Sequence, residues 1–100
     1  MLTFESVLGI FSDYLKKDKD LEVISTKHGY AALLWDSDIE DWSSVQLCRT
    51  PKDLFDRLLG HYQTYLGVPF VKDHGSLTLE DRVQIDNMCL SYLEQRNKLE

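Results

Sequence analysis

The sequence predicts a small α+β domain in which one helix precedes an antiparallel sheet of two or three strands and two helices follow it. Three observations indicate this order. Apolar residues recur every three to four positions near both ends, β-branched residues gather between positions 21 and 48, and two Thr-based helix starts lie in the second half. A length of 100 residues with 43% hydrophobic content suits one domain, which we assign to residues 1–100.

The first helix is predicted from Thr3 to about Lys17. Thr3 is a favourable N-cap, and Glu5 lies where negative charge suits the helix dipole. The apolar residues of the segment recur at helical spacing and form one stripe: Phe4, Val7, Leu8, Phe11 and Leu15. This stripe is the face that we expect to pack on the sheet.

Two strands and a tight turn come next. Residues 21–26 are rich in β-branched side chains, and residues 27–29 end in a glycine that can supply the positive φ of a hairpin turn. Residues 30–35 are apolar on both faces, so we expect this strand to be central and covered on both sides. Residues 42–48 alternate between polar and apolar side chains, which predicts a third, shorter strand at an edge.

The second helix begins with the sharpest local signal in the chain. Thr50 is a good N-cap and Pro51 is favoured at the first helical position. We expect the helix to run to about Leu66, to end at Gly67 and to be prevented from continuing by Pro69. Residues 68–77 are then a connector that contains a turn at residues 73–76.

The last helix is predicted from a cap at Thr78 to about Asn97. Its apolar stripe consists of Ile85, Met88, Cys89 and Tyr92, flanked by Val83 and Leu93. We therefore expect an antiparallel sheet that is packed by three helices in the order α-β-β-(β)-α-α.

The charge and the composition exclude several classes of function. A net charge of −6 disfavours binding to a nucleic-acid backbone and to an anionic membrane surface. The sequence contains neither a run of roughly 20 apolar residues nor the layout of a signal peptide, so we expect a cytoplasmic protein without a membrane partner. Cys48 and Cys89 are too few for a disulfide framework and are interpreted as buried thiols.

An acidic loop at residues 36–41 is the most suggestive local feature. Asp36, Asp38, Glu40 and Asp41 are weak candidates for binding a divalent cation, because alternate carboxylates on a loop gather hard cations. The loop departs from the EF-hand pattern, since Asp41 stands where Gly is needed and Leu47 stands at the closing Glu position. We therefore favour a solvated turn and assign no metal site.

Two tryptophans flank this loop and offer a second interpretation of it. Trp and Tyr are enriched at binding hot spots, so a partner-binding patch would consist of Trp35, Asp38, Glu40, Asp41 and Trp42. The alternative is that both rings fill the core between sheet and helices, which we favour because large aromatic side chains are usually mostly buried.

No catalytic or cofactor-binding residue can be assigned. The three histidines form no metal-binding motif, no nucleophile elbow surrounds a serine, and the five glycines are too scattered for a phosphate loop. Aromatic residues on the second helix, Phe55, Tyr62 and Tyr65, could support a homodimer, although packing against the sheet is the simpler interpretation. The sequence therefore predicts a protein that is not an enzyme and needs no cofactor.

The order of these features resembles a group of small bacterial proteins. The residues that carry the resemblance are Leu34-Trp35-Asp36, Asp41-Trp42 and Leu47-Cys48-Arg49-Thr50-Pro51 before a helix. The pattern is similar to small uncharacterised proteins of Gram-positive bacteria, some of them found in mobile elements, and covers most of the chain. The resemblance implies a cytoplasmic accessory or interaction protein and supplies no activity and no site residue.

Three hypotheses of function follow. The first is a non-enzymatic protein-interaction module whose surface includes residues 36–42. The second is a divalent-cation-binding domain that uses the loop at residues 36–41. The third is an acidic mimic of nucleic acid that occupies the groove of a basic partner.

Overall fold

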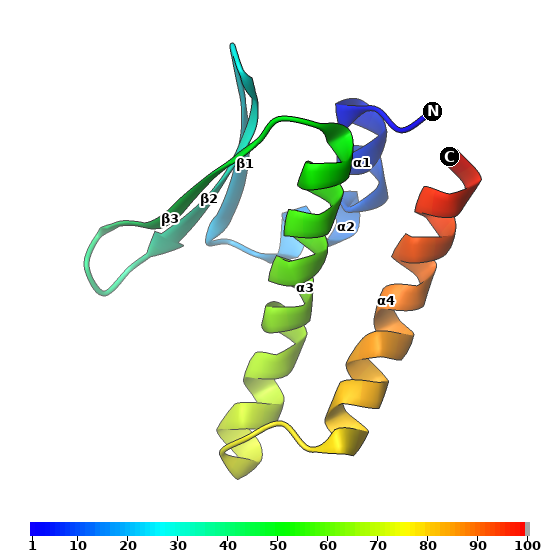
Figure 1. Cartoon of the computed structure of the whole chain (residues 1–100). Helices are drawn as coiled ribbons and strands as arrows, with labels where there is room; N and C mark the ends of the chain where they lie inside the picture. Colours follow the sequence, from blue (N-terminus) through cyan, green and yellow to red (C-terminus); the bar gives the residue numbers. More distant parts are fainter. Residues whose placement is uncertain (100) are drawn as a thin grey trace.

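The computed structural model describes residues 1–99 and shows, within them, a three-stranded antiparallel sheet with four helices on one of its sides (Figure 1). The elements are α1 (Phe4–Ile10), α2 (Ser12–Lys17), β1 (Leu21–Thr26), β2 (Gly29–Asp36), β3 (Asp41–Cys48), α3 (Pro51–His74) and α4 (Leu79–Leu99). The predicted α+β class is confirmed, and the predicted third strand is present. None of the helices in residues 1–99 is long and apolar enough to cross a bilayer.

The predicted first helix is divided into α1 and α2 at Phe11. Thr3 caps α1 as predicted, because its hydroxyl accepts the Ser6 N–H at 3.0 Å and the Ser6 hydroxyl oxygen accepts the Thr3 N–H at 2.9 Å. The backbone of Phe11 leaves helical geometry at φ −94° and ψ 10°. Its ring is fully buried and lies 5.2 Å from the Phe55 ring and 4.7 Å from the Tyr92 ring. The break therefore lies at the point where α1 and α2 are anchored to α3 and α4.

The sheet has the order β1-β2-β3, so β2 is central and β3 is an edge strand, as predicted. The β1–β2 turn depends on Gly29, whose φ is +130° and where a Cβ would clash with the Cys48 carbonyl oxygen. Leu34 pairs with Ser44 but Trp35 pairs with Trp42, so Ser43 is an extra residue and forms a bulge in β3.

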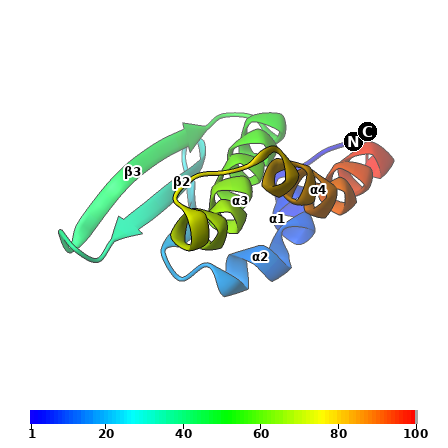
Figure 2. The ribbon, with the colours of Figure 1, turned by 90° about the horizontal axis from the view of Figure 1, so that it is seen from below.

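The core lies between one face of the sheet and the helices. Side chains from every strand and from α1, α2 and α3 build it: Val7, Ile10, Phe11, Tyr14, Leu21, Ala32, Cys48, Leu54, Phe55 and Leu58. Helix α4 adds partly buried side chains that include Tyr92 and Leu93. Figures 1 and 2 show α3 between the sheet and α4, so α3 contributes to both layers of packing.

The prediction that β2 is covered on both faces is wrong. The helices pack on one face only, which we call the inner face, and the opposite face carries no helix (Figure 2). Ala31 and Leu33 point to this opposite face and are buried, yet they lie outside the core cluster. Their register neighbours on the edge strands, Ile24, Val45 and Leu47, lie beside them. The sequence predicted that a second layer would bury this face of β2. Side chains of the neighbouring strands bury Ala31 and Leu33 instead.

The predicted end of the second helix is also wrong, because α3 continues through Gly67 and Pro69 to His74. Gly67 is buried near Leu77 and Ile85, so this part of α3 packs against the connector and the start of α4. The helix ends instead at Gly75, which has the left-handed φ of +82° and donates its N–H to the Val71 carbonyl at 2.7 Å. Tertiary packing here outweighs the loss of one helical hydrogen bond at Pro69.

Helix α4 begins as predicted, with reciprocal capping. The Thr78 hydroxyl accepts the Asp81 N–H at 3.1 Å, and the Asp81 carboxylate accepts the Thr78 N–H at 3.0 Å. The helix runs to Leu99, and Ile85 and Cys89 are buried as expected. Met88 and Val83 are exposed, which corrects their predicted places in the stripe, because the inward face advances by four residues from Asp81 to Ile85 to Cys89.

Thr78→Ala is expected to lower the free energy of unfolding by about 1 kcal/mol, since it leaves the Asp81 N–H without its capping acceptor. Thr78→Ser is the matched control, because it keeps the hydroxyl and is expected to retain nearly all of the stability. Urea unfolding followed by circular dichroism measures both variants. Equal losses in the two would assign the effect to the Thr methyl group rather than to the cap.

Candidate protein-interaction surface

The hairpin between β2 and β3 gathers the predicted acidic residues at its tip. We call Asp36, Asp38, Glu40 and Asp41 the acidic tip. Carboxylates of the tip shape the turn, because Asp36 accepts the Asp38 N–H at 2.9 Å and Asp41 accepts the Trp42 N–H at 2.7 Å. Glu40 adopts the left-handed region with φ 50°. The tip is thus a turn organised by side-chain-to-backbone hydrogen bonds, and it projects away from the helices (Figure 1).

The acidic tip does not have the geometry of a cation site. Within residues 1–99, no three His, Cys, Asp or Glu side chains converge closely enough to hold a metal ion. One carboxylate oxygen of Asp36 and one of Asp41 already accept backbone N–H groups. The cation-binding alternative therefore gains no support from the arrangement of these residues.

Trp35 and Trp42 lie together on the face of the sheet that carries no helix, so the interpretation that they fill the sheet–helix core is wrong. Each side chain is 36% exposed, and their rings meet edge to face with centroids 5.1 Å apart. The bulge at Ser43 is the physical reason, because it rotates Trp42 onto the same face as Trp35. The two rings form one aromatic pair beside the acidic tip.

Apolar side chains continue from this pair across most of the uncovered face. We call this surface the outer face. Glu22 on β1, which pairs with Leu33, is a charged member of it, and its apolar members are Ile24, Ala31, Leu33, Trp35, Trp42, Val45 and Leu47. Val45 is 64% exposed, Ile24 44% and Leu47 43%. Isolated exposed apolar side chains are common, but a contiguous set on three neighbouring strands is typical of a surface that another molecule covers.

The alternation of β3 is inverted relative to the usual pattern for an exposed sheet. Polar Ser44 and Gln46 pair with Leu34 and Ala32 and face the helices, whereas apolar Val45 and Leu47 face solvent. In an antiparallel sheet with one open face, apolar residues normally point to the core and polar residues to water. The apolar side chains of β3 thus lie on the outer face, as they would if that face were covered by another layer.

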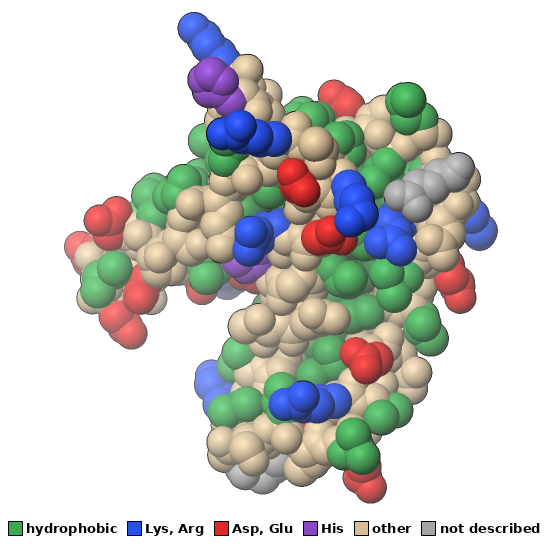
Figure 3. All heavy atoms as spheres, viewed as in Figure 1, with side chains coloured by type: hydrophobic (Ala, Val, Ile, Leu, Met, Phe, Trp, Pro, Cys, Tyr) green, Lys and Arg blue, Asp and Glu red, His purple; other side chains and the backbone are tan. Residues whose placement is uncertain are grey.

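The two ends of the strands carry opposite charges. The acidic tip lies at one end, and Lys27, His28 and Arg49 lie at the other, which we call the basic end. The three residues of the basic end lie close together because Gly29, which follows the Lys27–His28 turn, packs its backbone against that of Arg49. Figure 3 shows red side chains gathered at the β2–β3 tip and blue and purple ones where β1 turns into β2. The outer face is therefore an apolar strip with one negative and one positive end.

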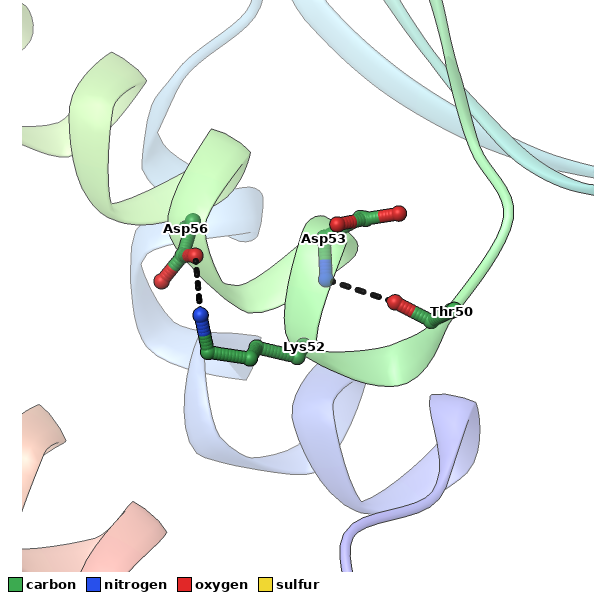
Figure 4. Close-up of polar contacts among 4 residues, drawn as sticks. All are labelled: Thr50, Lys52, Asp53 and Asp56. Atoms are coloured by element: carbon green, nitrogen blue, oxygen red, sulfur yellow. Dashed lines mark hydrogen bonds and ion pairs between the residues drawn. The ribbon is translucent and has the colours of Figure 1, made fainter.

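A polar cleft of about 600 Å³ lies on the other side of β3, against α3. Its lining includes Gln46, Asp53, Asp56, Arg57 and His61. The Asp53 N–H donates to the Thr50 hydroxyl at 3.1 Å, and Lys52 pairs with Asp56 at 3.5 Å. Figure 4 shows how these four side chains lie. Both contacts belong to the first turns of α3, and the exposed Lys52–Asp56 pair contributes little to stability.

Burial shifts the pKa values of two groups that line the cleft, His61 and Cys48. Burial lowers the pKa of His61, with a further contribution from the nearby positive charge of Arg57. Burial also raises the pKa of the Cys48 thiol, so this thiol stays protonated near neutral pH and is a poor nucleophile. The predicted burial of both Cys48 and Cys89 is confirmed.

No family model matches the chain, and neither a curated protein nor a solved structure matches it. The resemblance to small proteins of Gram-positive bacteria consequently stays a prediction. What the protein does is inferred from the chemistry of its surface alone.

Proposed function

We propose that this chain is a non-enzymatic protein-interaction module that binds a partner protein through the outer face. The inverted alternation of β3 carries the proposal, because it places Val45 and Leu47 in water while Ser44 and Gln46 face the helices. Such a pattern is costly for a sheet that stays open and favourable for one that is covered.

The chemistry of the surface specifies the kind of partner that fits it. An apolar patch is needed to cover Ile24, Val45 and Leu47, and basic groups are needed next to the acidic tip. Trp35 and Trp42 provide rigid aromatic contact area beside the tip, which is typical of binding hot spots. The predicted patch of Trp35, Asp38, Glu40, Asp41 and Trp42 is thus proposed as one end of a larger surface.

The decisive variant replaces the three most exposed aliphatic side chains of the outer face: Ile24→Thr, Val45→Thr and Leu47→Thr. Thr is β-branched and favours strands, so the strands are expected to form normally. Partners captured by the wild-type protein are identified by cross-linking, purified and titrated by calorimetry. We expect the triple variant, called the outer-face variant, to bind them at least tenfold more weakly.

A matched control changes three exposed apolar residues of α4: Leu79→Gln, Val83→Gln and Leu90→Gln. This α4 variant removes a comparable number of exposed apolar side chains from a different face, and we expect it to bind as the wild type does. Equal affinity of the outer-face variant and the wild type would refute the proposal. So would a loss of binding in the α4 variant alone.

The acidic tip is expected to govern the rate of association rather than the rate of dissociation. Asp38→Ser, Glu40→Ser and Asp41→Ser together remove three charges that lie at the rim of the surface. Rim charges mainly steer the encounter of two proteins, and salt screens them. Stopped-flow mixing should show slower association and a weaker dependence on salt, and an unchanged salt dependence would remove the tip from the surface.

A further inference from the structure

We infer that the partner that covers the outer face is a second copy of this chain, packed face to face with its strands reversed. The inference rests on the proposed function, because it names the occupant of the same surface. Two features of the outer face, the charges at its two ends and its distribution of bulk, are self-complementary under one two-fold rotation, which leaves Glu22 at the rim on edge strand β1.

The charges define the direction of the strands in the dimer. A two-fold axis that lies between the two sheets and runs across the strands brings the acidic tip of one copy to the basic end of the other. Because the symmetry repeats the contact, both tips meet basic ends. An axis parallel to the strands would instead place tip on tip and Lys27 on Lys27, so like charges would oppose this arrangement.

The distribution of side-chain size favours the same direction. The bulky Trp35–Trp42 pair lies near the acidic tip, and the small side chain of Ala31 lies toward the basic end between Ile24 and Leu47. Reversal of the strands places each aromatic pair over the other copy's Ala31 region. Large side chains then meet small ones across the interface, which is how close packing between two sheets is achieved.

The size of the surface sets the expected strength. Three strands at the usual spacing span about 14 Å, and six residues along them span about 20 Å. This footprint of about 280 Å² per copy lies well below the roughly 800 Å² per partner of standard interfaces, so we expect a weak, reversible dimer with a dissociation constant of about 100 μM. The measurement must therefore extend to several hundred micromolar protein.

The first experiment measures the oligomeric state of the whole chain. Sedimentation velocity over rising concentration is expected to show a monomer that becomes a dimer, and the outer-face variant is expected to stay monomeric while the α4 variant dimerises. Both tryptophans of the chain lie on the outer face, so their fluorescence emission should shift to the blue as the dimer forms. A dimer without this shift would overturn the inference.

A charge exchange tests the direction of packing. One variant carries Asp38→Lys, Glu40→Lys and Asp41→Lys, so that with Asp36 the tip has a net charge of +2. A second carries Lys27→Glu and Arg49→Glu, so that the basic end has a net charge of −2. Each alone is expected to dimerise at least tenfold more weakly, since it opposes like charges twice. An equimolar mixture is expected to recover affinity, because in the mixed dimer both tip-to-end contacts become attractive again. Failure of the mixture to recover affinity would overturn the reversed arrangement.

A last variant separates face packing from pairing through the free edge of β3. Ile24→Thr lies on β1, the strand farthest from that edge. It is expected to weaken a face-to-face dimer several-fold, whereas a dimer paired through β3 would be unaffected and would refute the inference. A wild-type protein that stays monomeric at all concentrations also refutes it, yet leaves the proposed function standing if the outer-face variant still loses binding to another protein.

Discussion

Phe55→Ala is expected to lower the free energy of unfolding by about 3–5 kcal/mol, the largest effect that we predict for a single substitution. Phe55 is fully buried on α3, where the helix lies between the sheet and α4. Its ring lies 5.2 Å from that of Phe11, and the Arg96 guanidinium stacks 4.9 Å from its centroid. Removal of the ring therefore opens a cavity that contacts the α1–α2 junction, α3 and α4 at once.

Two contributions add in this estimate. The first is the lost transfer of a large aromatic side chain from water, and the second is the cavity that well-packed neighbours cannot close. Arg96 adds to the cost of the cavity, because its aliphatic stem and guanidinium lose contact with the Phe55 ring. Since a domain of this size has a total stability of roughly 5–15 kcal/mol, the variant should unfold at a much lower urea concentration.

Urea titration followed by circular dichroism measures the change, with Val68→Ala as the control on the same helix. Val68 is exposed, so its truncation is expected to change stability by less than about 0.5 kcal/mol. A Phe55→Ala variant that loses no more than the Val68→Ala variant would show that α3 does not join the two layers through this ring.

The local chemistry of the chain predicted where helices begin better than where they end. Thr3, Thr50 and Thr78 were each predicted as caps, and each hydroxyl accepts the backbone N–H three residues on. Such a cap depends on neighbours in sequence alone. The end of α3 depends instead on the packing of Gly67 against Leu77 and Ile85, and this contact is not visible as a local pattern.

The candidate surface was predicted only at one end. Trp35, Trp42 and the acidic tip stood out in the sequence because of their residue types, whereas Val45 and Leu47 resembled ordinary strand residues. The sequence signal that could have found them is the alternation of residues 42–48, which does not reveal which set of side chains faces the helices. The bulge at Ser43 moves the Trp42 side chain to the opposite face of the sheet. The residue types of the strand do not predict a bulge at this position.

The free energy of unfolding is expected to fall steeply above pH 10, because of two tyrosines in the helical layer, the buried Tyr14 and the partly buried Tyr92. Tyr14 is 1% exposed and donates its hydroxyl to the Asp18 carboxylate at 2.6 Å. Burial, followed by the hydrogen bond and the negative charge of Asp18, raises the pKa of Tyr14 well above its ordinary value of 10. Burial and the neighbouring Tyr62 also raise the pKa of Tyr92, to about 12.

The sign of the effect follows from the protons that each state binds. A tyrosine with a raised pKa in the folded state contributes its full stability below pH 10 and loses it as the pH rises, because only the unfolded chain releases the proton there. Each such tyrosine costs about 1.4 kcal/mol per pH unit above pH 10. Tyr14 alone is therefore expected to remove roughly 2.3 kcal/mol between pH 10 and pH 12.

Tyr14→Phe distinguishes this titration from a general effect of alkali. The variant lacks the hydrogen bond to Asp18 and is expected to be about 1 kcal/mol less stable at pH 7. It also has no proton to lose at this position, so its stability should decline less steeply above pH 10, and the two curves should converge and then cross. Urea unfolding at a series of pH values measures both proteins, and tyrosinate absorbance follows the titration. Parallel curves between pH 10 and pH 12 would mean that the Tyr14 hydroxyl titrates alike in the folded and unfolded chains, which is incompatible with its burial beside a carboxylate.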